Sequence, residues 1–152
     1  MSRHDQLWRW LPVAAWAALI SLFSTGAFAF DRTGLLIVPV LHVIFPGASP
    51  EELRAMHSSI RKFAHFAEYL VLSVLLYRAL RAGRRWDVRA AGMAVAIAGL
   101  YSIGDELHQW FVPGRTAAAS DCLIDVSGAA AGQGLLAAFG KSRRATRPAR
   151  AS

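Results

Sequence analysis

Hydrophobic positions along the chain gather into four long runs, at about residues 11–30, 63–80, 88–107 and 122–139. Each run approaches the roughly 20 apolar residues that cross a hydrocarbon layer about 30 Å thick. None of them alternates with a period of two, so the pattern favours helices over a closed β-barrel. We therefore expect an all-α polytopic membrane protein with about four transmembrane helices.

The connection between the first two runs has a different pattern. It contains the sequence "TGLLIVPVLHVIFPGASPEEL", in which an apolar piece too short to span is interrupted by Pro39 and Pro46. We interpret it as an interfacial or re-entrant segment. A helix is expected to begin near the end of this sequence, with Ser49 as the N-cap and Pro50 at the first helical position.

Composition agrees with a membrane protein. Of the 152 residues, 55% are hydrophobic and 18% are charged, and the mean hydropathy is +0.33, which is too apolar for an ordinary soluble domain of this size. The single Cys122 excludes an internal disulfide and a C-x-x-C metal motif. We expect one domain over residues 1–140, followed by a basic, disordered cytoplasmic tail at 141–152.

The net charge of +7 is explained by topology rather than by nucleic acid, because apolar runs separate the basic clusters. Twelve of the 17 basic residues lie in the N-terminus, the loop after the second run and the C-terminal tail. The positive-inside rule then places both termini in the cytoplasm. One alternative stays open: Arg3, Arg9 and the "AFA" at 27–29 resemble a cleavable signal peptide, although the apolar run is longer than usual.

Polar residues collect at the opposite end of the spans. A charged side chain at the bilayer centre costs about 2.5–3.5 kcal/mol on insertion scales. Acids in or beside the spans should therefore face each other, a cation or a wet cavity. Spacing places Lys62, His65 and Tyr69 on one helix face. The remaining candidates are Asp105, Glu106 and Gln109 near the end of the third run, Arg115 after a Pro113-Gly114 turn, and Asp121 and Asp125, whose stripe continues through Gly128 and Gly132.

Three segments carry a family resemblance: "KFAHFAEYL", "DELHQWFVPGRTAAASD" and "DVSGAAAG". In order and spacing they resemble the VanZ-like family of small bacterial integral membrane proteins, with the motif core at 61–132. One departure is Asp125, where many members carry Asn. The resemblance implies a multi-span protein of the bacterial inner membrane and a link, through the founding member, to low-level glycopeptide resistance. It supplies no established reaction.

The polar cluster has several interpretations. Asp105, Glu106, Asp121 and Arg115 could form an internal ion-pair network, since the planar Arg fork binds carboxylates bidentately. Alternatively, Lys62 and Arg115, with His65, would hold a phosphate or carboxylate. His65 could transfer protons or serve as a helix contact. A divalent metal is disfavoured because no strict ligand spacing occurs, so neither a metal nor another cofactor is expected.

These interpretations lead to three functional hypotheses. The favoured one is an outward-facing site that binds an anionic lipid headgroup, a cell-wall precursor or a glycopeptide-type antibiotic. The second is an enzyme acting on a phosphorylated envelope lipid, and the third a proton-coupled transporter or flippase component. The third requires a homo-oligomer or a second protein, because four spans are few for a complete transporter. Nucleic acid is not an expected partner.

Overall fold

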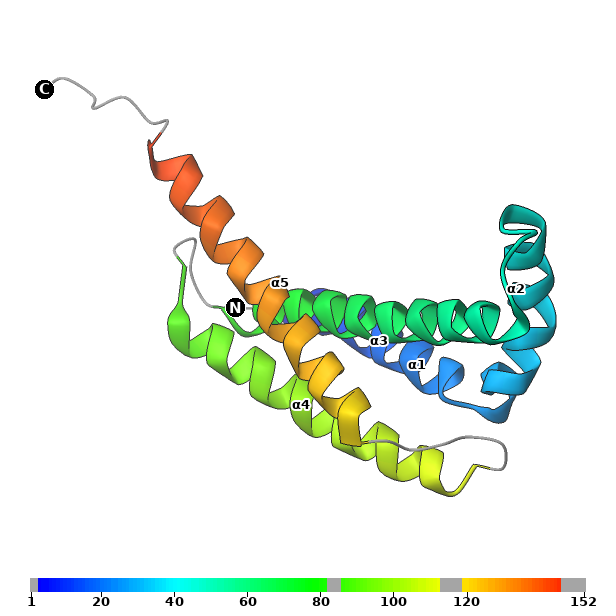
Figure 1. Cartoon of the computed structure of the whole chain (residues 1–152). Coiled ribbons are helices and arrows are strands. Elements are labelled where there is room, and N and C mark those ends of the chain that lie inside the picture. The colour runs from blue at the N-terminus through cyan, green and yellow to red at the C-terminus, as the bar shows by residue number, and fades with distance from the viewer. Residues whose placement is uncertain (1–2, 82–85, 113–118, 146–152) are drawn as a thin grey trace, which may run out of the picture.

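The computed structural model describes residues 3–81, 86–112 and 119–145, which form α-helices, one short 3-10 helix and no β-strand. The predicted all-α polytopic membrane fold is confirmed (Figure 1). The elements, in chain order, are α1 (Arg3–Phe23), η1 (Gly26–Phe28), α2 (Phe30–Ile44), α3 (Pro50–Leu80), α4 (Val88–Trp110) and α5 (Ala119–Ala145). Helix α5 includes residues 141–145 of the expected tail, and residues 146–152 lie outside the described part.

The first helix ends earlier than its apolar run. The prediction of an unbroken helix to Phe30 is wrong, because α1 stops at Phe23 and the chain turns before η1. Ser, Thr and Gly at positions 24–26 have weak helix propensity. The Thr25 hydroxyl also donates to the Leu22 carbonyl at 2.7 Å, which closes the last turn. This early stop brings the Ser24 side chain into the interior.

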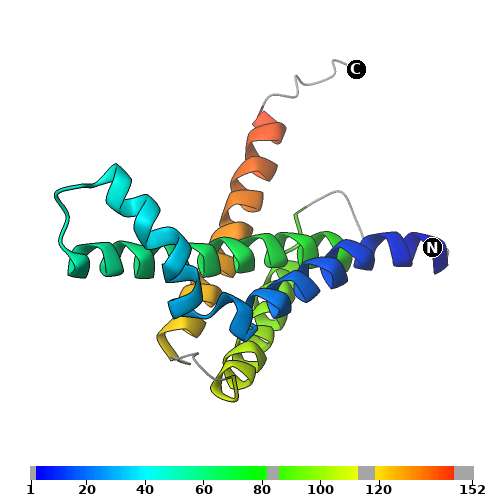
Figure 2. The same ribbon diagram turned by 90° about the vertical axis from the view of Figure 1, so that its right-hand side faces the viewer.

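Helix α2 lies crosswise to α3 at one end of the molecule (Figures 1 and 2). The expectation that Pro39 interrupts this segment is wrong, since α2 continues through it to Ile44. The expectation that the segment is too short to span also needs correction, because Gly26–Ile44 is long and apolar enough to cross a membrane. Its crosswise placement is nevertheless the arrangement expected of an interfacial segment.

Helix α3 joins the predicted interfacial helix and the predicted second span into one element of 31 residues. Its start is confirmed: Ser49 accepts from the Glu52 N–H, Glu52 accepts from the Ser49 N–H at 2.7 Å, and Pro50 begins the helix. At 1.5 Å per residue the helix is about 46 Å long, more than the roughly 30 Å hydrocarbon layer. Part of α3 must therefore extend beyond the layer, or the helix must tilt.

Two further segments of the described chain, besides Gly26–Ile44, are long and apolar enough to cross a membrane: Pro50–Leu80 and Ser120–Phe139. Helices α1 and α4, with 21 and 23 residues, have the length but are not among these candidate spans. Large apolar side chains face outward on α1, α2, α4 and α5, for example Leu11, Leu36, Leu100 and Leu123. Lipid contact accounts for such exposure, since lipid tails are as apolar as Leu.

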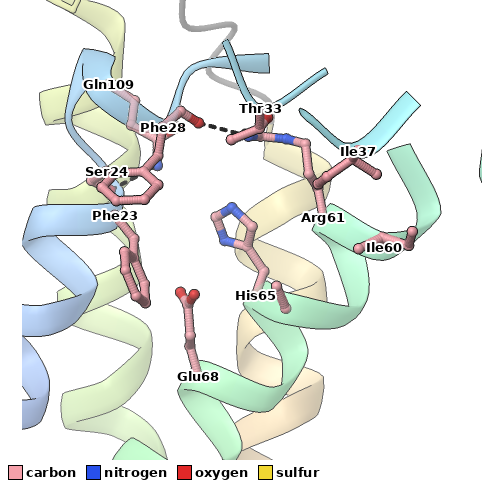
Figure 3. A pocket seen from close by; sticks show the side chains of 11 residues that line it. Phe23, Ser24, Phe28, Thr33, Ile37, Ile60, Arg61, His65, Glu68 and Gln109 are labelled. Carbon is pink, nitrogen blue, oxygen red and sulfur yellow. Dashed lines mark hydrogen bonds between the residues drawn. The ribbon is translucent and has the colours of Figure 1, made fainter. Parts of the chain in front are cut away.

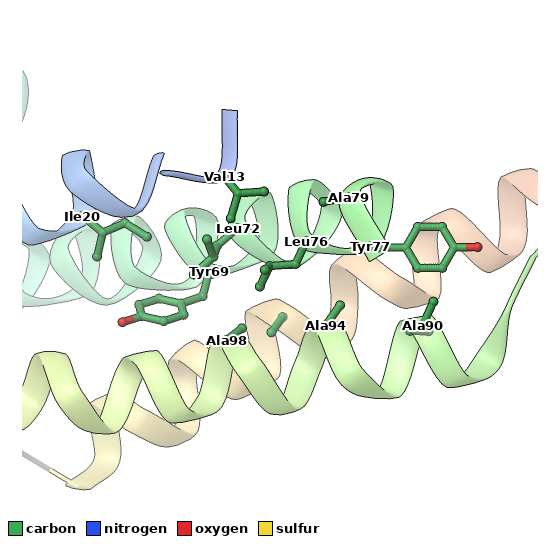
Figure 4. Packing of buried hydrophobic residues seen from close by; sticks show 12 residues of the cluster. Val13, Ile20, Tyr69, Leu72, Leu76, Tyr77, Ala79, Ala90, Ala94 and Ala98 are labelled. Atoms are coloured by element: carbon green, nitrogen blue, oxygen red, sulfur yellow. The ribbon is translucent and has the colours of Figure 1, made fainter. Parts of the chain in front are cut away.

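The apolar core lies between α1, α3 and α4. Tyr69, Leu72 and Leu76 of α3 contribute its large side chains, while α4 presents small ones, including Ala94 and Ala98 (Figure 4). Small residues let two helix backbones approach closely and gain van der Waals contact, which drives helix association in membranes. In the core, large side chains of α3 thus pack against a face of α4 that carries small side chains.

Helix α5 approaches α3 closely along its glycine stripe. A Cβ atom on Gly128 would lie 2.2 Å from the Phe66 carbonyl oxygen of α3, and one on Gly132 would lie 2.8 Å from that of Leu70. The Ser73 hydroxyl of α3 donates to the carbonyl of Ala129, the residue after Gly128, at 2.7 Å. The two backbones are therefore in contact along this crossing, where no side chain larger than hydrogen fits at Gly128.

Gly128→Ala should destabilise the fold by about 1–3 kcal/mol, the usual cost of overpacking, because backbone rather than a movable side chain blocks the added methyl group. Thermal unfolding of the purified protein in detergent measures the effect. Gly134→Ala on the same helix is the control, since nothing lies within 4 Å of its added Cβ. Equal melting temperatures for the two variants would contradict the close crossing.

Candidate functional site

One face of α3 brings three ionisable side chains to the same cavity. Arg61, His65 and Glu68 follow the i, i+4, i+7 spacing of a single helix face. The backbone under them is held from α1, because the Trp16 indole N–H donates to the Glu68 carbonyl at 2.9 Å. Figure 3 shows the side chains of His65 and Glu68 pointing into this cavity.

The cavity, here called the Arg61 pocket, has a volume of about 260 Å³. It forms where α1 ends and η1, α2 and α4 meet α3. Its walls are mostly apolar, and its polar side chains sit among them (Figure 3). The apolar lining comes from Phe23, Phe28, Ile37, Ile60 and Ala64, and the polar lining from Ser24, Thr33, Arg61, His65, Glu68 and Gln109.

Arg61 is anchored at the side of this pocket. Its guanidinium donates to the Phe28 carbonyl at 3.0 Å and lies 5.8 Å from the centre of the Phe30 ring. The carboxylates of Glu68 and Asp121 act on it electrostatically. One of five N–H donors of the guanidinium makes the Phe28 bond. The side chain is therefore oriented by α2 and η1 while its charge faces the pocket.

His65 is oriented from α5. Its Nδ1 lies 3.3 Å from Oδ1 of Asp125, and the other carboxylate oxygen accepts from the Ser102 hydroxyl at 2.6 Å. Asp125 is 1% exposed, so its carboxylate is shielded from water and lies between His65 and Ser102. Because Nδ1 faces Asp125, the opposite ring nitrogen, Nε2, is on the pocket side. The carboxylate therefore determines which side of the imidazole is turned toward the pocket.

A second buried carboxylate ties α4 to the end of α1. Asp105 accepts from the Ser24 hydroxyl with one oxygen and from the Gln109 amide at 2.9 Å with the other. The same amide also lies within 3.0 Å of the Ser24 hydroxyl oxygen. All three side chains are buried. Charge-assisted hydrogen bonds of this kind offset the cost of removing a carboxylate from water.

Two tyrosines complete the polar layer. The Tyr69 hydroxyl is buried near Ser102 and the carboxylates of Asp105 and Asp125. Tyr101 donates to the Ala17 carbonyl at 2.7 Å. Since a hydroxyl has one proton, the Ser21 hydroxyl must be the donor in its 2.6 Å contact with Tyr101. These contacts connect α1, α3, α4 and α5 at one depth.

The structure gathers many of the predicted site residues. His65, Tyr69, Asp105, Gln109 and Asp125 share the buried polar layer, and Glu106 is also buried on α4. Asp121 is half-buried in the first turn of α5. Lys62 is exposed and does not line the pocket. Arg115 lies outside the described residues, as do Pro113 and Gly114.

Arg61, Ser24, Ser102 and Glu68 contribute to the site but were not among the predicted ligand-binding residues. The signal for Arg61 was present, since its spacing to His65 and Glu68 defines one helix face. The sequence prediction placed the neighbouring Lys62 on the face of His65 and Tyr69 instead. The roles of Ser24 and Ser102 could not be predicted from the sequence, because a single Ser in an apolar run is common in membrane helices. Within residues 3–81, 86–112 and 119–145, no group of three or more His, Cys, Asp or Glu side chains is arranged to hold a metal ion.

The fold and the polar layer together define a polytopic helical membrane protein with a buried layer of polar and ionisable residues. A family model described as VanZ/LLP1 matches residues 7–140. The chain belongs to the VanZ/LLP1 family, which confirms the resemblance seen in the sequence motifs. Comparisons with curated proteins and with solved structures found no match.

Ser24→Ala should lower the free energy of unfolding by about 1–3 kcal/mol, because it leaves the buried Asp105 carboxylate and Gln109 amide each short of a partner. Ser21→Ala, one turn earlier, is the control: it is exposed, and Tyr101 keeps its bond to Ala17. Its effect should stay within about 0.5 kcal/mol. Chemical denaturation in mixed micelles measures both, and equal losses would contradict the Ser24 role.

Proposed function

We propose that this chain binds the anionic headgroup of an amphipathic molecule of the bacterial envelope in the Arg61 pocket. The ligand classes are a membrane lipid, a lipid-linked cell-wall precursor or a glycopeptide-type antibiotic. The observation that carries the proposal is the position of Arg61 and His65 in a cavity with otherwise largely apolar walls. Family membership supports an envelope protein and does not identify the ligand.

The chemistry of the lining favours an amphipathic anion. A guanidinium recognises phosphate or carboxylate through paired N–H groups, and His65 adds a second donor when protonated. The apolar side chains of Ile37, Ile60 and Phe28 suit the first carbons of a hydrocarbon chain. The volume of about 260 Å³ lies below the 300–1,000 Å³ typical of pockets for drug-sized ligands. The pocket therefore suits a headgroup better than a whole glycopeptide antibiotic.

The pocket also has the depth that a lipid headgroup needs. Arg9 of α1 donates to the Arg81 carbonyl at 3.3 Å, so these basic residues mark one end of the bundle. Arg61 is twenty residues before Arg81, which is about 30 Å along a helix, the thickness of the hydrocarbon layer. We assign the Arg81 end to the cytoplasm, with both termini, and the Arg61 pocket to the outer boundary of the inner membrane.

Arg61→Ala should abolish retention of an anionic lipid or wall precursor that accompanies the protein extracted from its own membrane. Native mass spectrometry measures the retained molecules. Lys62→Ala is the matched control, because it removes the same charge from the next residue, which is exposed and outside the pocket. Equal retention by wild type and Arg61→Ala would overturn the proposal.

The His65–Asp125 pair supports a second candidate, an enzyme acting on a phosphorylated envelope lipid. In that role Nε2 of His65 would take a proton from water that attacks phosphorus, with Asp125 stabilising the imidazolium. The P–O bond to the lipid would break and its oxygen would take up a proton, giving the lipid alcohol and phosphate. Arg61 would stabilise the charge that develops on the phosphoryl oxygens.

If this second candidate is correct, His65→Gln should eliminate phosphate release from a labelled lipid monophosphate. Asp125→Asn should lower the rate of release while lipid retention persists, because it disturbs the orientation of the imidazole and not Arg61. The assay uses the full chain in vesicles with magnesium present. No turnover by folded wild-type protein would exclude this candidate and leave the binding proposal standing.

A further inference from the structure

The Arg61 pocket contains charges of both signs. The Arg61 guanidinium and the Glu68 carboxylate both line it, and His65 lies between them on the same face of α3. Their seven-residue separation is about 10 Å along the helix axis, and both side chains are long. In Figure 3 Glu68 points into the pocket from the inner end of this face, while Arg61 lies at the other end.

The charge balance of the pocket opposes a ligand that is only anionic. Three carboxylates act on His65, those of Glu68, Asp121 and Asp125, and two of them also act on Arg61. Like charges repel strongly where the effective dielectric constant is low. A phosphate held at Arg61 would therefore be repelled by Glu68, unless the ligand also carries a positive charge.

We infer that the ligand is zwitterionic, with a phosphate ester that contacts Arg61 and a primary ammonium group that contacts Glu68. This inference rests on the proposed function and specifies its headgroup as one of the phosphoethanolamine type. The ammonium group offers three N–H donors, which suit a carboxylate acceptor. Each charge of the ligand then meets its opposite across the pocket.

Other features of the lining agree with an ammonium group in the pocket. Phe23 and Phe28 line the same pocket and pack edge to face, with ring centres 5.0 Å apart, and the face of an aromatic ring attracts a cation. Gln109 and Ser24 add polar atoms to the lining. A volume of about 260 Å³ suits one headgroup of this kind.

The test compares two lipids that share a phosphate and differ in the amine. Full-length protein is reconstituted in vesicles with equal amounts of phosphatidylethanolamine and phosphatidylglycerol of the same acyl chains, and retained lipid is read by native mass spectrometry. Wild type should retain the ethanolamine lipid about tenfold more, the ratio that corresponds to about 1.4 kcal/mol. Glu68→Gln, which keeps the shape and removes the charge, should bring the ratio close to one.

Two matched variants separate the possible outcomes. Glu51→Gln removes a carboxylate from the exposed first turn of α3 and should keep the wild-type ratio. Arg61→Ala should lose both lipids. Equal retention of the two lipids by wild type, or an unchanged ratio in Glu68→Gln, would overturn the zwitterionic ligand but not the proposed function. Retention of both lipids by Arg61→Ala at the wild-type level would overturn the proposed function as well.

Discussion

The close crossing of α3 and α5 is the contact on which the rest of the structure depends. Gly128 of α5 lies directly against the Phe66 carbonyl of α3. Phe66 is one residue after His65, and Gly128 is three residues after Asp125. A wider separation would move Asp125 away from the imidazole and Ser73 away from the Ala129 carbonyl. Because helix association in lipid relies on close van der Waals packing, the same glycines stabilise the bundle and position its buried polar pair.

The buried acids follow from a second constraint, the cost of a charge in a low-dielectric interior. Asp125 lies against the His65 imidazole of α3 and accepts a hydrogen bond from Ser102 of α4, and Asp105 accepts hydrogen bonds from α1 and within α4. Each carboxylate therefore connects helices that are distant in sequence. Removing one partner would leave a buried charge short of hydrogen bonds, so these networks specify one arrangement of the helices. They also determine which atoms of His65 and Gln109 face the pocket.

The pocket itself results from the early end of α1. If α1 continued to Phe30, η1 would not form and α2 would not begin there. The turn at Ser24 instead lets η1 and α2 cross over the end of the bundle. Phe28 and Phe30 then hold the guanidinium of Arg61 from this side. A cation fixed beside apolar walls is the physical basis of the proposed binding role.

Sequence by itself determined the class of fold, the capped start of α3, the glycine stripe and the gathering of polar residues at one end. These features depend on hydropathy, helix periodicity and local capping, which act over a few residues. Sequence also favoured Lys62 over Arg61 and extended α1 to Phe30. Only tertiary structure decided that Arg61 faces the pocket, that His65 pairs with Asp125, and that Ser24 and Ser102 complete the carboxylate networks. Those choices depend on how far each helix rotates and how closely it crosses its neighbour, which packing between distant segments sets.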